Sequence, residues 1–168
     1  MSYIIVRRES RWAGFLDSVL MVPYVVPGVV MAIGFLLTFN QPPLDLVGTA
    51  WIIVLILFIR RLPYGLRATS ALRQIKPSIE EAAIGLGASP ARAFATVTVP
   101  LMLPGIVAGA MMSFITAINE LSSTLLLYTA RTTTMPVKVY SAVLDGEFGI
   151  AAALSTLLLA SSGLCVYV

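Results

Sequence analysis

The chain has few of the side chains on which enzymes and metal proteins depend. It contains no histidine and a single cysteine, Cys165, so an internal disulfide is impossible and a zinc or haem site is not expected. The phosphate-binding pattern Gly-x-x-x-x-Gly-Lys-Ser/Thr is also missing. Nor does the sequence suggest paired carboxylates in a pocket. We therefore expect no catalytic residue, no metal site and no cofactor.

Charged residues are scarce as well. Only 11% of the 168 residues are charged, while 58% are hydrophobic and the mean hydropathy is +0.94. A soluble domain carries about 25% charged residues. An apolar surface of this extent requires an apolar solvent, so the sequence predicts an integral membrane protein that contacts lipid. Nucleic acid is not an expected partner.

Four apolar stretches are candidates for membrane-spanning helices. They cover residues 18–39, 47–62, 101–119 and 148–168. The second stretch is the shortest, but Trp51 and Tyr64 lie where interfacial aromatic residues are expected. The predicted fold class is therefore all-α: a polytopic transmembrane helix bundle with about four spans in this chain.

Basic residues are distributed unequally between the segments that flank these spans. If the N-terminus and residues 60–99 lie on one side, that side holds nine of the eleven lysines and arginines, including Arg60 and Arg61. The positive-inside rule makes this side cytoplasmic. The sequence thus predicts a cytoplasmic N-terminus, a cytoplasmic loop over about residues 63–100, and an outer position for Glu120.

The predicted loop begins a short helix near residue 78. Ser78 and Glu81 form a Ser-x-x-Glu capping box, and Gly87 is placed to end the helix. An apolar ridge on this helix is suited to docking in a partner's groove or to lying on the membrane. The residues of the ridge are Ile79, Ala82, Ala83 and Leu86.

A second short helix follows in the same loop. Ser89 is a suitable N-cap and Pro90 a suitable first-turn residue, and we expect this helix to end near Pro100. Two short capped helices are rigid enough to transmit a displacement, whereas a plain linker is not. The loop is therefore a candidate coupling element.

The loop also carries a specific motif. Glu-Ala-Ala is followed after three residues by Gly, and after nine more by apolar-x-apolar-Pro. This pattern resembles the cytoplasmic coupling loop, or EAA loop, of the membrane permease subunits of type I binding-protein-dependent ABC importers. The residues that carry the resemblance are Glu81, Ala82, Ala83, Gly87 and Pro100.

Further along the chain, residues 118–123, 134–137 and the Tyr140 segment are similar to the ferric iron (Fe3+) branch of that family. Polyamine, phosphonate, thiamine and molybdate permeases share much of the pattern. The resemblance implies a permease domain over residues 1–168 that is partial, since the family core has five or six spans. Both ends look cut, so a fragment is expected.

The resemblance also implies partners and a location. The motif residues would dock on a cytoplasmic ABC ATPase subunit, which hydrolyses ATP in place of this chain. A periplasmic solute-binding protein would deliver the solute, and a second permease half or subunit would complete the pathway. The expected location is the bacterial plasma (inner) membrane, as a multi-pass protein.

A polar group follows the third apolar stretch. It comprises Asn119, Glu120, Ser122 and Ser123, and an ionisable residue near membrane depth is a functional candidate. Two interpretations remain open: part of the translocation path or gate, or the mere end of a span. One acid does not make an iron site. In the first stretch, Pro23 and Pro27 predict a bend that either moves during gating or is a static kink.

Two other classes of function compete with an ATP-driven importer subunit. A secondary transporter or channel would need ion-coupling acids within the spans, which carry almost no charge. The loop motif argues against this class. A truncated, non-transporting membrane subunit is compatible with the motif and stays an alternative.

Overall fold

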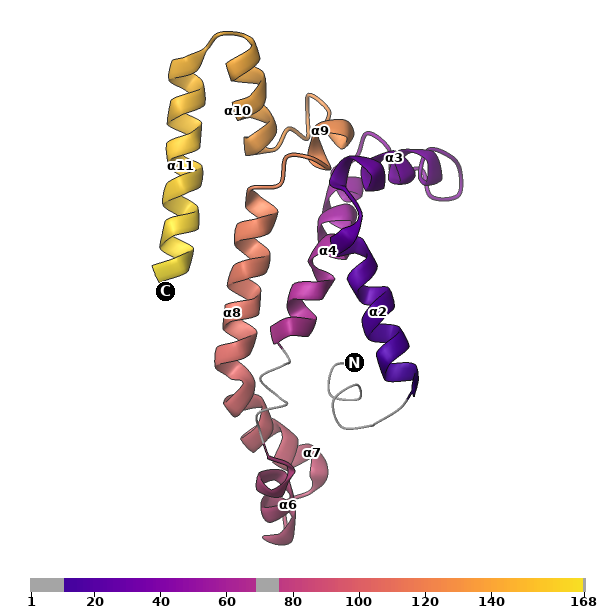
Figure 1. Cartoon of the computed structure of the whole chain (residues 1–168), viewed down its shortest axis with the longest axis vertical. Helices are drawn as coiled ribbons and strands as arrows, with labels where there is room; N and C mark the ends of the chain where they lie inside the picture. The colour runs from indigo at the N-terminus through magenta and orange to yellow at the C-terminus, as the bar shows by residue number, and fades with distance from the viewer. Residues whose placement is uncertain (1–10, 69–75, 168) are drawn as a thin grey trace. The chain divides into compact units, whose positions relative to one another are not determined.

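The computed structural model describes residues 11–68 and 76–167. All regular elements in these ranges are helices, which confirms the predicted fold class (Figure 1). Contacts divide the chain into two compact units, one drawn from residues 1–21 and 62–112 and the other from 22–61 and 113–168. The main apolar core belongs to the second unit, and the Glu-Ala-Ala motif to the first.

The first apolar stretch is broken rather than continuous. Helix α2 (Arg11–Val25) and helix α3 (Gly28–Thr38) meet at an angle of 104°, so they form either a broken span or a re-entrant loop. Pro27 lies in the break, where it has no N–H to donate and restricts the residue before it to extended conformations. The predicted bend is confirmed at Pro27, whereas Pro23 lies inside α2.

Helix α4 (Ala50–Ala68) differs from the predicted span over residues 47–62 at both ends. It begins three residues later and continues through Pro63, whose side chain is fully buried. Packing around this ring outweighs the backbone hydrogen bond that proline removes. The polar loop therefore begins after Ala68, and Arg60 and Arg61 lie within a helix.

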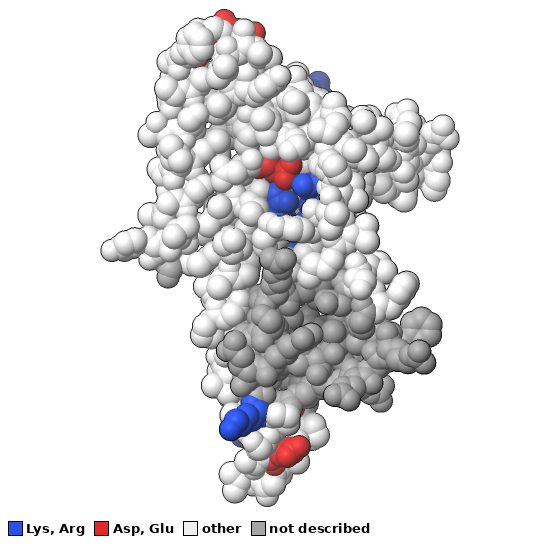
Figure 2. Space-filling model, in the orientation of Figure 1, with Lys and Arg blue, Asp and Glu red and all other residues white. Residues whose placement is uncertain are grey.

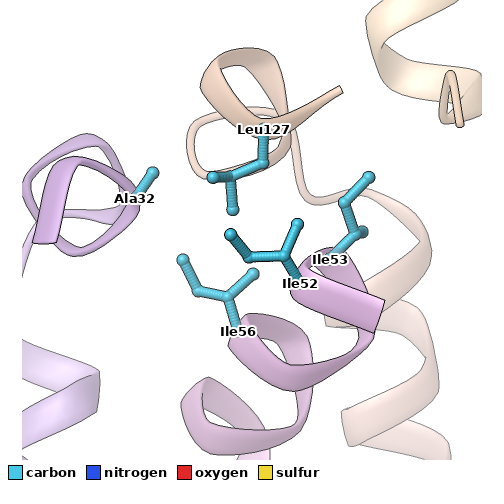
Figure 3. Packing of buried hydrophobic residues seen from close by; sticks show 5 residues of the cluster. All are labelled: Ala32, Ile52, Ile53, Ile56 and Leu127. Carbon is cyan, nitrogen blue, oxygen red and sulfur yellow. The ribbon is translucent and has the colours of Figure 1, made fainter. Parts of the chain in front are cut away.

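The core of the second unit is a small aliphatic cluster (Figure 3). Ile52 and Ile56 are one turn apart on α4 and are both completely buried. Ala32 approaches from α3, and the small side chain permits close packing. Leu127 comes from the short helix α9 (Thr124–Leu127). This cluster joins α3, α4 and α9, the elements that surround the polar group described below.

The loop region folds into helices that lead directly into a long apolar helix. Helix α6 (Pro77–Gly85) is followed by α7 (Pro90–Ala93), the π-helical turn η1 (Phe94–Thr98) and α8 (Val99–Ile118). We expected the second loop helix to end near Pro100, and this prediction was wrong. Residues Pro90–Ile118 form one continuous helix of 29 residues.

The widened turn η1 explains why Pro100 does not break this helix. The N–H of Val99 bonds to the carbonyl of Phe94, five residues back, instead of four. The next residue is Pro100, which has no N–H to contribute. A π-type turn widens the helix directly before the ring, which in a regular α-helix would collide with the carbonyl four residues back.

The C-terminal part of the second unit is a helical hairpin. Helix α10 (Met135–Leu144) is followed by α11 (Phe148–Tyr167), which packs beside it (Figure 1). Gly146, at φ +76°, joins the two helices.

Among the described residues, two helices are long and apolar enough to cross a membrane: Pro90–Ile118 and Phe148–Tyr167. The bent α2–α3 pair makes a third if it counts as one span. We predicted about four. The predicted span that does not qualify is α4, because Arg60 and Arg61 interrupt its run of apolar residues. Apolar side chains such as Leu159 and Val166 are 74% exposed, as expected of a lipid-facing surface.

Candidate functional site

The start of α6 differs from the predicted capping box. The helix begins at Pro77 with Lys76 as N-cap, and no side chain caps it. Proline is favoured at the first helical position because its fixed φ suits the helix and its missing N–H is not needed there. Ser78 consequently lies inside the helix, and the pairing of Ser78 with Glu81 as a cap was wrong.

The end of α6 is as predicted. Gly87 has φ +93°, a left-handed conformation that suits glycine. Its N–H bonds to the carbonyl of Ile84 at 2.9 Å, and the N–H of Ala88 bonds to the carbonyl of Ala83 at 3.1 Å. These two bonds form a Schellman motif and satisfy carbonyls that the helix end leaves without partners. The turn between the loop helices is therefore fixed by hydrogen bonds.

Helix α7 also begins as predicted. The hydroxyl of Ser89 accepts a bond from the N–H of Arg92 at 3.4 Å, and Pro90 occupies the first turn. Because α7 runs through η1 into α8, the loop helices have no flexible joint on this side. A force on α7 is thus applied directly to the long apolar helix.

The helix pair exposes apolar side chains. Leu86 is 91% exposed, Ile79 43% and Ile84 40%. Of the motif residues, Glu81, Ala82, Gly87 and Pro100 are exposed, and Ala83 is half-buried. The predicted ridge is therefore accessible, with Leu86 at its most prominent point. Sequence reasoning did not foresee that the adjacent acid, Glu80, is buried.

The second candidate site is a charged cluster around Glu120 in the other unit. One carboxylate oxygen, Oε2, accepts a bond from Arg61 Nη2 at 3.0 Å, and Arg60 Nε lies 3.7 Å from the same oxygen. The other, Oε1, accepts bonds from the hydroxyl and the N–H of Ser123 at 2.9 and 3.2 Å. The three ionised side chains are between 9% and 15% exposed.

Both arginines also bond to backbone carbonyls. Arg61 Nη2 donates to Thr116 in the last turns of α8. Arg60 Nη1 donates to Val26 at 3.2 Å, in the break between α2 and α3. The cluster therefore ties α4 to the end of α8 and to the bend. Figure 2 shows basic and acidic atoms meeting in a face that is otherwise mostly uncharged.

Gly28, the first residue of α3, packs against this cluster. A Cβ at this position would lie 3.0 Å from Ser122 Cβ, 3.1 Å from Arg60 Nη1 and 3.1 Å from the backbone N of Ser123. Two of these three neighbours belong to the segment that follows Glu120. Only glycine allows the backbone to approach this closely.

The four polar candidates separate in the structure. Glu120 and Ser123 are bonded to each other, and Ser122 lies against Gly28. Asn119 instead donates to Ser162 on α11 at 2.9 Å. Sequence reasoning missed Arg60 and Arg61, whose one signal was that they end an apolar run as an adjacent pair.

The ion pairs correct part of the predicted topology. Arg60 and Arg61 were assigned to the cytoplasmic edge and Glu120 to the outer end of a span, yet the 3.0 Å pair places them together. Glu120 follows Ile118, the last residue of the candidate span. Burial raises the pKa of Glu120, but hydrogen bonds from Arg61 and Ser123 and the charge of Arg60 outweigh burial and leave it below its ordinary value.

The described residues contain no group of three or more histidine, cysteine, aspartate or glutamate side chains that could hold a metal ion. The second site consists of a nearly buried carboxylate that is ion-paired with two guanidinium groups. It can position backbone elements and bind charged groups.

Comparison with known families gives a match over residues 1–168 to the family described as binding-protein-dependent transport system inner membrane component. The ferric transport system permease protein FbpB of Actinobacillus pleuropneumoniae is 32% identical over 160 residues, which are 95% of this chain but 23% of that protein. A protein named as a 2-aminoethylphosphonate transport system permease, PhnV, of Salmonella typhi is 33% identical, over 91% of this chain and 57% of its own length. The chain thus spans only part of these relatives.

A solved structure is similar in fold. A chain from inward-facing structures of the MetNI methionine ABC transporter superimposes with a TM-score of 0.77 at 16% identity. The match covers 99% of this chain and 79% of that chain. At this level of identity the likeness concerns the fold alone.

Proposed function

The chain belongs to the family of binding-protein-dependent transport system inner membrane components, and on this premise we propose that it is a permease part of an ATP-driven importer. The observation that carries the proposal is that the Glu-Ala-Ala loop forms two defined helices, α6 and α7, of which α7 is continuous with α8. The loop is proposed to dock on a cytoplasmic ABC ATPase subunit, where ATP is hydrolysed.

The surface of the loop supports this docking. Exposed apolar side chains on a short helix suit the groove of a partner, because burying them there removes apolar area from water. Leu86 is the proposed central contact, since it is 91% exposed. Glu81, Ala82, Ala83 and Gly87 shape the surface around it, and Pro100 lies where the loop helices enter α8.

The remaining partners follow from the same family. We propose that a periplasmic solute-binding protein delivers the solute, and that a second permease half or subunit completes the pathway in the inner membrane. The N-terminus is proposed to be cytoplasmic. Without Arg60 and Arg61, seven of the eleven basic residues still lie in the N-terminal and loop segments assigned to that side.

Ferric iron is the proposed solute. Its support is the similarity to the ferric permease FbpB over 95% of this chain. A phosphonate is the second candidate solute, because the match to PhnV covers 57% of that protein, whereas the match to FbpB covers 23% of that protein. Uptake of labelled iron and of labelled 2-aminoethylphosphonate by cells expressing the complete transporter distinguishes the two.

Asn119, Glu120, Ser122 and Ser123 are proposed to line or gate the solute pathway. The contacts of Glu120 support a gate in particular, since its ion-pair partner Arg60 also bonds to the carbonyl of Val26, in the break between α2 and α3. If these residues only mark the end of a span, their substitution will change stability and leave the affinity for solute unchanged.

The proposal is tested by co-purifying the chain in detergent with the ATPase encoded nearest to it. Wild type is expected to capture the ATPase, and Glu81→Lys, Gly87→Pro and Leu86→Ser are expected to lose it. Matched controls are Glu147→Lys, Gly146→Pro and Leu44→Ser, which place the same changes at exposed positions outside the loop. Gly146 is a close control because it also has a positive φ in a helix-ending turn.

Capture by all three controls together with loss in the loop variants would establish the loop as the docking element. Failure of folded wild-type protein to capture the ATPase would contradict the proposal and favour a non-transporting membrane subunit. Loss in the controls as well would show that the effect comes from general destabilisation, and docking by the loop would then be rejected.

A further inference from the structure

Thr98, in the π-helical turn η1, differs from the other helical threonines that the structure describes. The hydroxyl of each of these others donates to a backbone carbonyl three or four residues back; they are Thr38, Thr96, Thr116, Thr124 and Thr156. Threonine does so commonly in helices, because its hydroxyl lies within reach of these carbonyls. Thr98 is completely buried, yet its hydroxyl has no partner among the described residues.

The winding of η1 explains why this hydroxyl is left over. The carbonyl four residues before Thr98 is that of Phe94, and in the π-helical turn it accepts the N–H of Val99. In a regular α-helix the N–H of Val99 bonds one residue further on, which leaves the Phe94 carbonyl to the N–H and the hydroxyl of Thr98. The π-helical winding therefore takes away the partner that Thr98 would have in an α-helix.

Two opposing costs meet in this turn. The π-helical winding leaves a buried hydroxyl without a partner, which is destabilising. The α-helical winding would satisfy Thr98, but the ring of Pro100 would then collide with the carbonyl of Thr96, four residues back. Each winding relieves one cost and incurs the other. Opposed costs of this kind are what a segment with two discrete arrangements requires.

A change of winding in η1 would turn the loop helices about the axis of α8. A π-helical turn fits five residues into the rotation that about four residues make in an α-helix, so conversion adds roughly 100° of rotation and about 1.5 Å of length. Helix α7 is continuous with η1, and α6 packs against α7. The two loop helices would therefore turn together. Both windings are helical, so the segment has two fixed settings rather than a flexible link.

We propose that η1 is a two-state joint that switches between a π-helical and an α-helical winding and thereby turns α6 and α7 relative to α8. Pro100 favours the π-helical form present in this structure, and Thr98 favours the α-helical form. The switch itself does not depend on the proposed function. Its use, which is to convert a movement of a docked ATPase into a movement of α8, rests on that function.

The test measures distances between spin labels on α6 and α8 by pulsed electron paramagnetic resonance, on the purified full chain in detergent. Cys165, the single native cysteine, is first replaced by serine, so that labels attach only at introduced cysteines. One label replaces Ile84 on α6, and the other replaces Ile106 or Ala108 on α8; all three positions are exposed. Packed helix axes are about 8–10 Å apart, so a rotation of roughly 100° moves α6 by more than about 10 Å. Ile106 and Ala108 lie on opposite faces of α8, so at least one of the two distances must change.

Wild type is expected to give mainly the distances of the π-helical form. Pro100→Ala removes the collision and is expected to move most molecules to a second distance for at least one label pair. Pro100 is exposed, so the substitution removes no buried contact. The matched control is Pro104→Ala, the same change at an exposed proline in α8 without a π-helical turn directly before it, and it is expected to keep the wild-type distances.

The role of the hydroxyl is measured in the Pro100→Ala background. Adding Thr98→Val is expected to lower the ratio of the second distance to the first by about fivefold, because valine cannot donate to the Phe94 carbonyl. Adding Thr96→Val is the control and is expected to leave that ratio unchanged, since the Thr96 hydroxyl is already bonded, to the carbonyl of Arg92, in the π-helical form.

The proposal is overturned if Pro100→Ala has the wild-type distances for both label pairs, or if Thr98→Val leaves the ratio unchanged. If Pro100→Ala does not fold, Pro100→Leu, another good helix former at the same exposed position, takes its place. Neither an ATPase nor a solute enters these measurements. A failure here therefore leaves the proposed importer function untouched, and a failure of ATPase capture leaves the two-state joint untouched.

Discussion

Arg61 donates a hydrogen bond of 3.0 Å to Glu120 although the two residues are 59 positions apart. The pair joins the middle of α4 to the segment between α8 and α9. Both side chains are nearly buried, at 11% and 9% exposure. This contact ties an apolar helix of the second unit to its polar residues.

Removing one member of this pair is expected to be more damaging than removing both. Arg61→Gln leaves the buried carboxylate with its bonds from Ser123 and with Arg60 at 3.7 Å as the one remaining cation, and a loss of about 3 kcal/mol in the free energy of unfolding is expected. The double variant with Glu120→Gln is expected to recover part of that loss. The measurement is a double-mutant cycle of unfolding free energies in mixed detergent micelles.

Additive effects of the two substitutions would contradict the pairing. Substitution of an exposed basic residue, Arg131→Gln, is the control and is expected to change the free energy by less than about 0.5 kcal/mol. Any coupling between Arg131 and Glu120 would point to a general charge effect.

Gly28 and Gly34 on α3 differ in how much room is available for a larger side chain. At Gly28 an added Cβ meets neighbours at 3.0–3.1 Å, including backbone, whereas at Gly34 nothing lies within 4 Å. Gly28→Ala is therefore expected to destabilise the protein by about 1–3 kcal/mol. Gly34→Ala is expected to stabilise it by up to about 1 kcal/mol, because alanine is the better helix former.

Thermal unfolding of the two alanine variants in the same detergent checks this expectation. Equal behaviour of the two variants would mean that α3 does not approach the segment after Glu120 as closely as the structure places it. The outcome thus bears directly on how the start of α3 packs against the segment after Glu120.

Thr98 in the π-helical turn is completely buried, and its hydroxyl has no hydrogen-bond partner among the described residues. Thr98→Val keeps the shape and removes the unsatisfied group, so a gain of about 1 kcal/mol in unfolding free energy is expected. Thr96→Val is the control, since the Thr96 hydroxyl is exposed and bonds to the carbonyl of Arg92 at 2.7 Å. A loss of stability in Thr98→Val would show that the hydroxyl is bonded in solution.

Local signals in the sequence were sufficient for much of the loop. Glycine at a left-handed position and serine before proline act through their nearest neighbours, and Gly87 and Ser89 were placed correctly for that reason. The capping box at Ser78 failed because Pro77 provides a competing start one residue earlier. The π-helical turn before Pro100 has no local signature that we recognised.

Long-range pairing could not be read in the same way. Glu120 was singled out as an isolated acid, but its partners Arg60 and Arg61 were counted as interfacial charges on the other side of the membrane. Nothing in a local pattern distinguishes an arginine that reaches the interface from one that is paired 59 residues away. Only the fold, which brings Arg61 on α4 to Thr116 and Glu120 at the end of α8, decides between them.

The last matched pair is Gly85, the final residue of helix α6, and Gly87, which lies in the turn after it. Gly87 has φ +93°, so Gly87→Ala forces an alanine into the left-handed region, at a cost of about 1 kcal/mol. Gly85 is the final residue of α6 and has no atom within 4 Å of an added Cβ, so Gly85→Ala is expected to gain up to about 1 kcal/mol in helix stability.

Hydrogen exchange at the backbone N–H groups of positions 87 and 88, which close the Schellman motif, reports the change where it occurs. Faster exchange in Gly87→Ala and slower exchange in Gly85→Ala are expected. The same exchange rates in both variants would show that the turn is not held in this conformation, and the loop would then lack the rigidity that coupling to an ATPase requires.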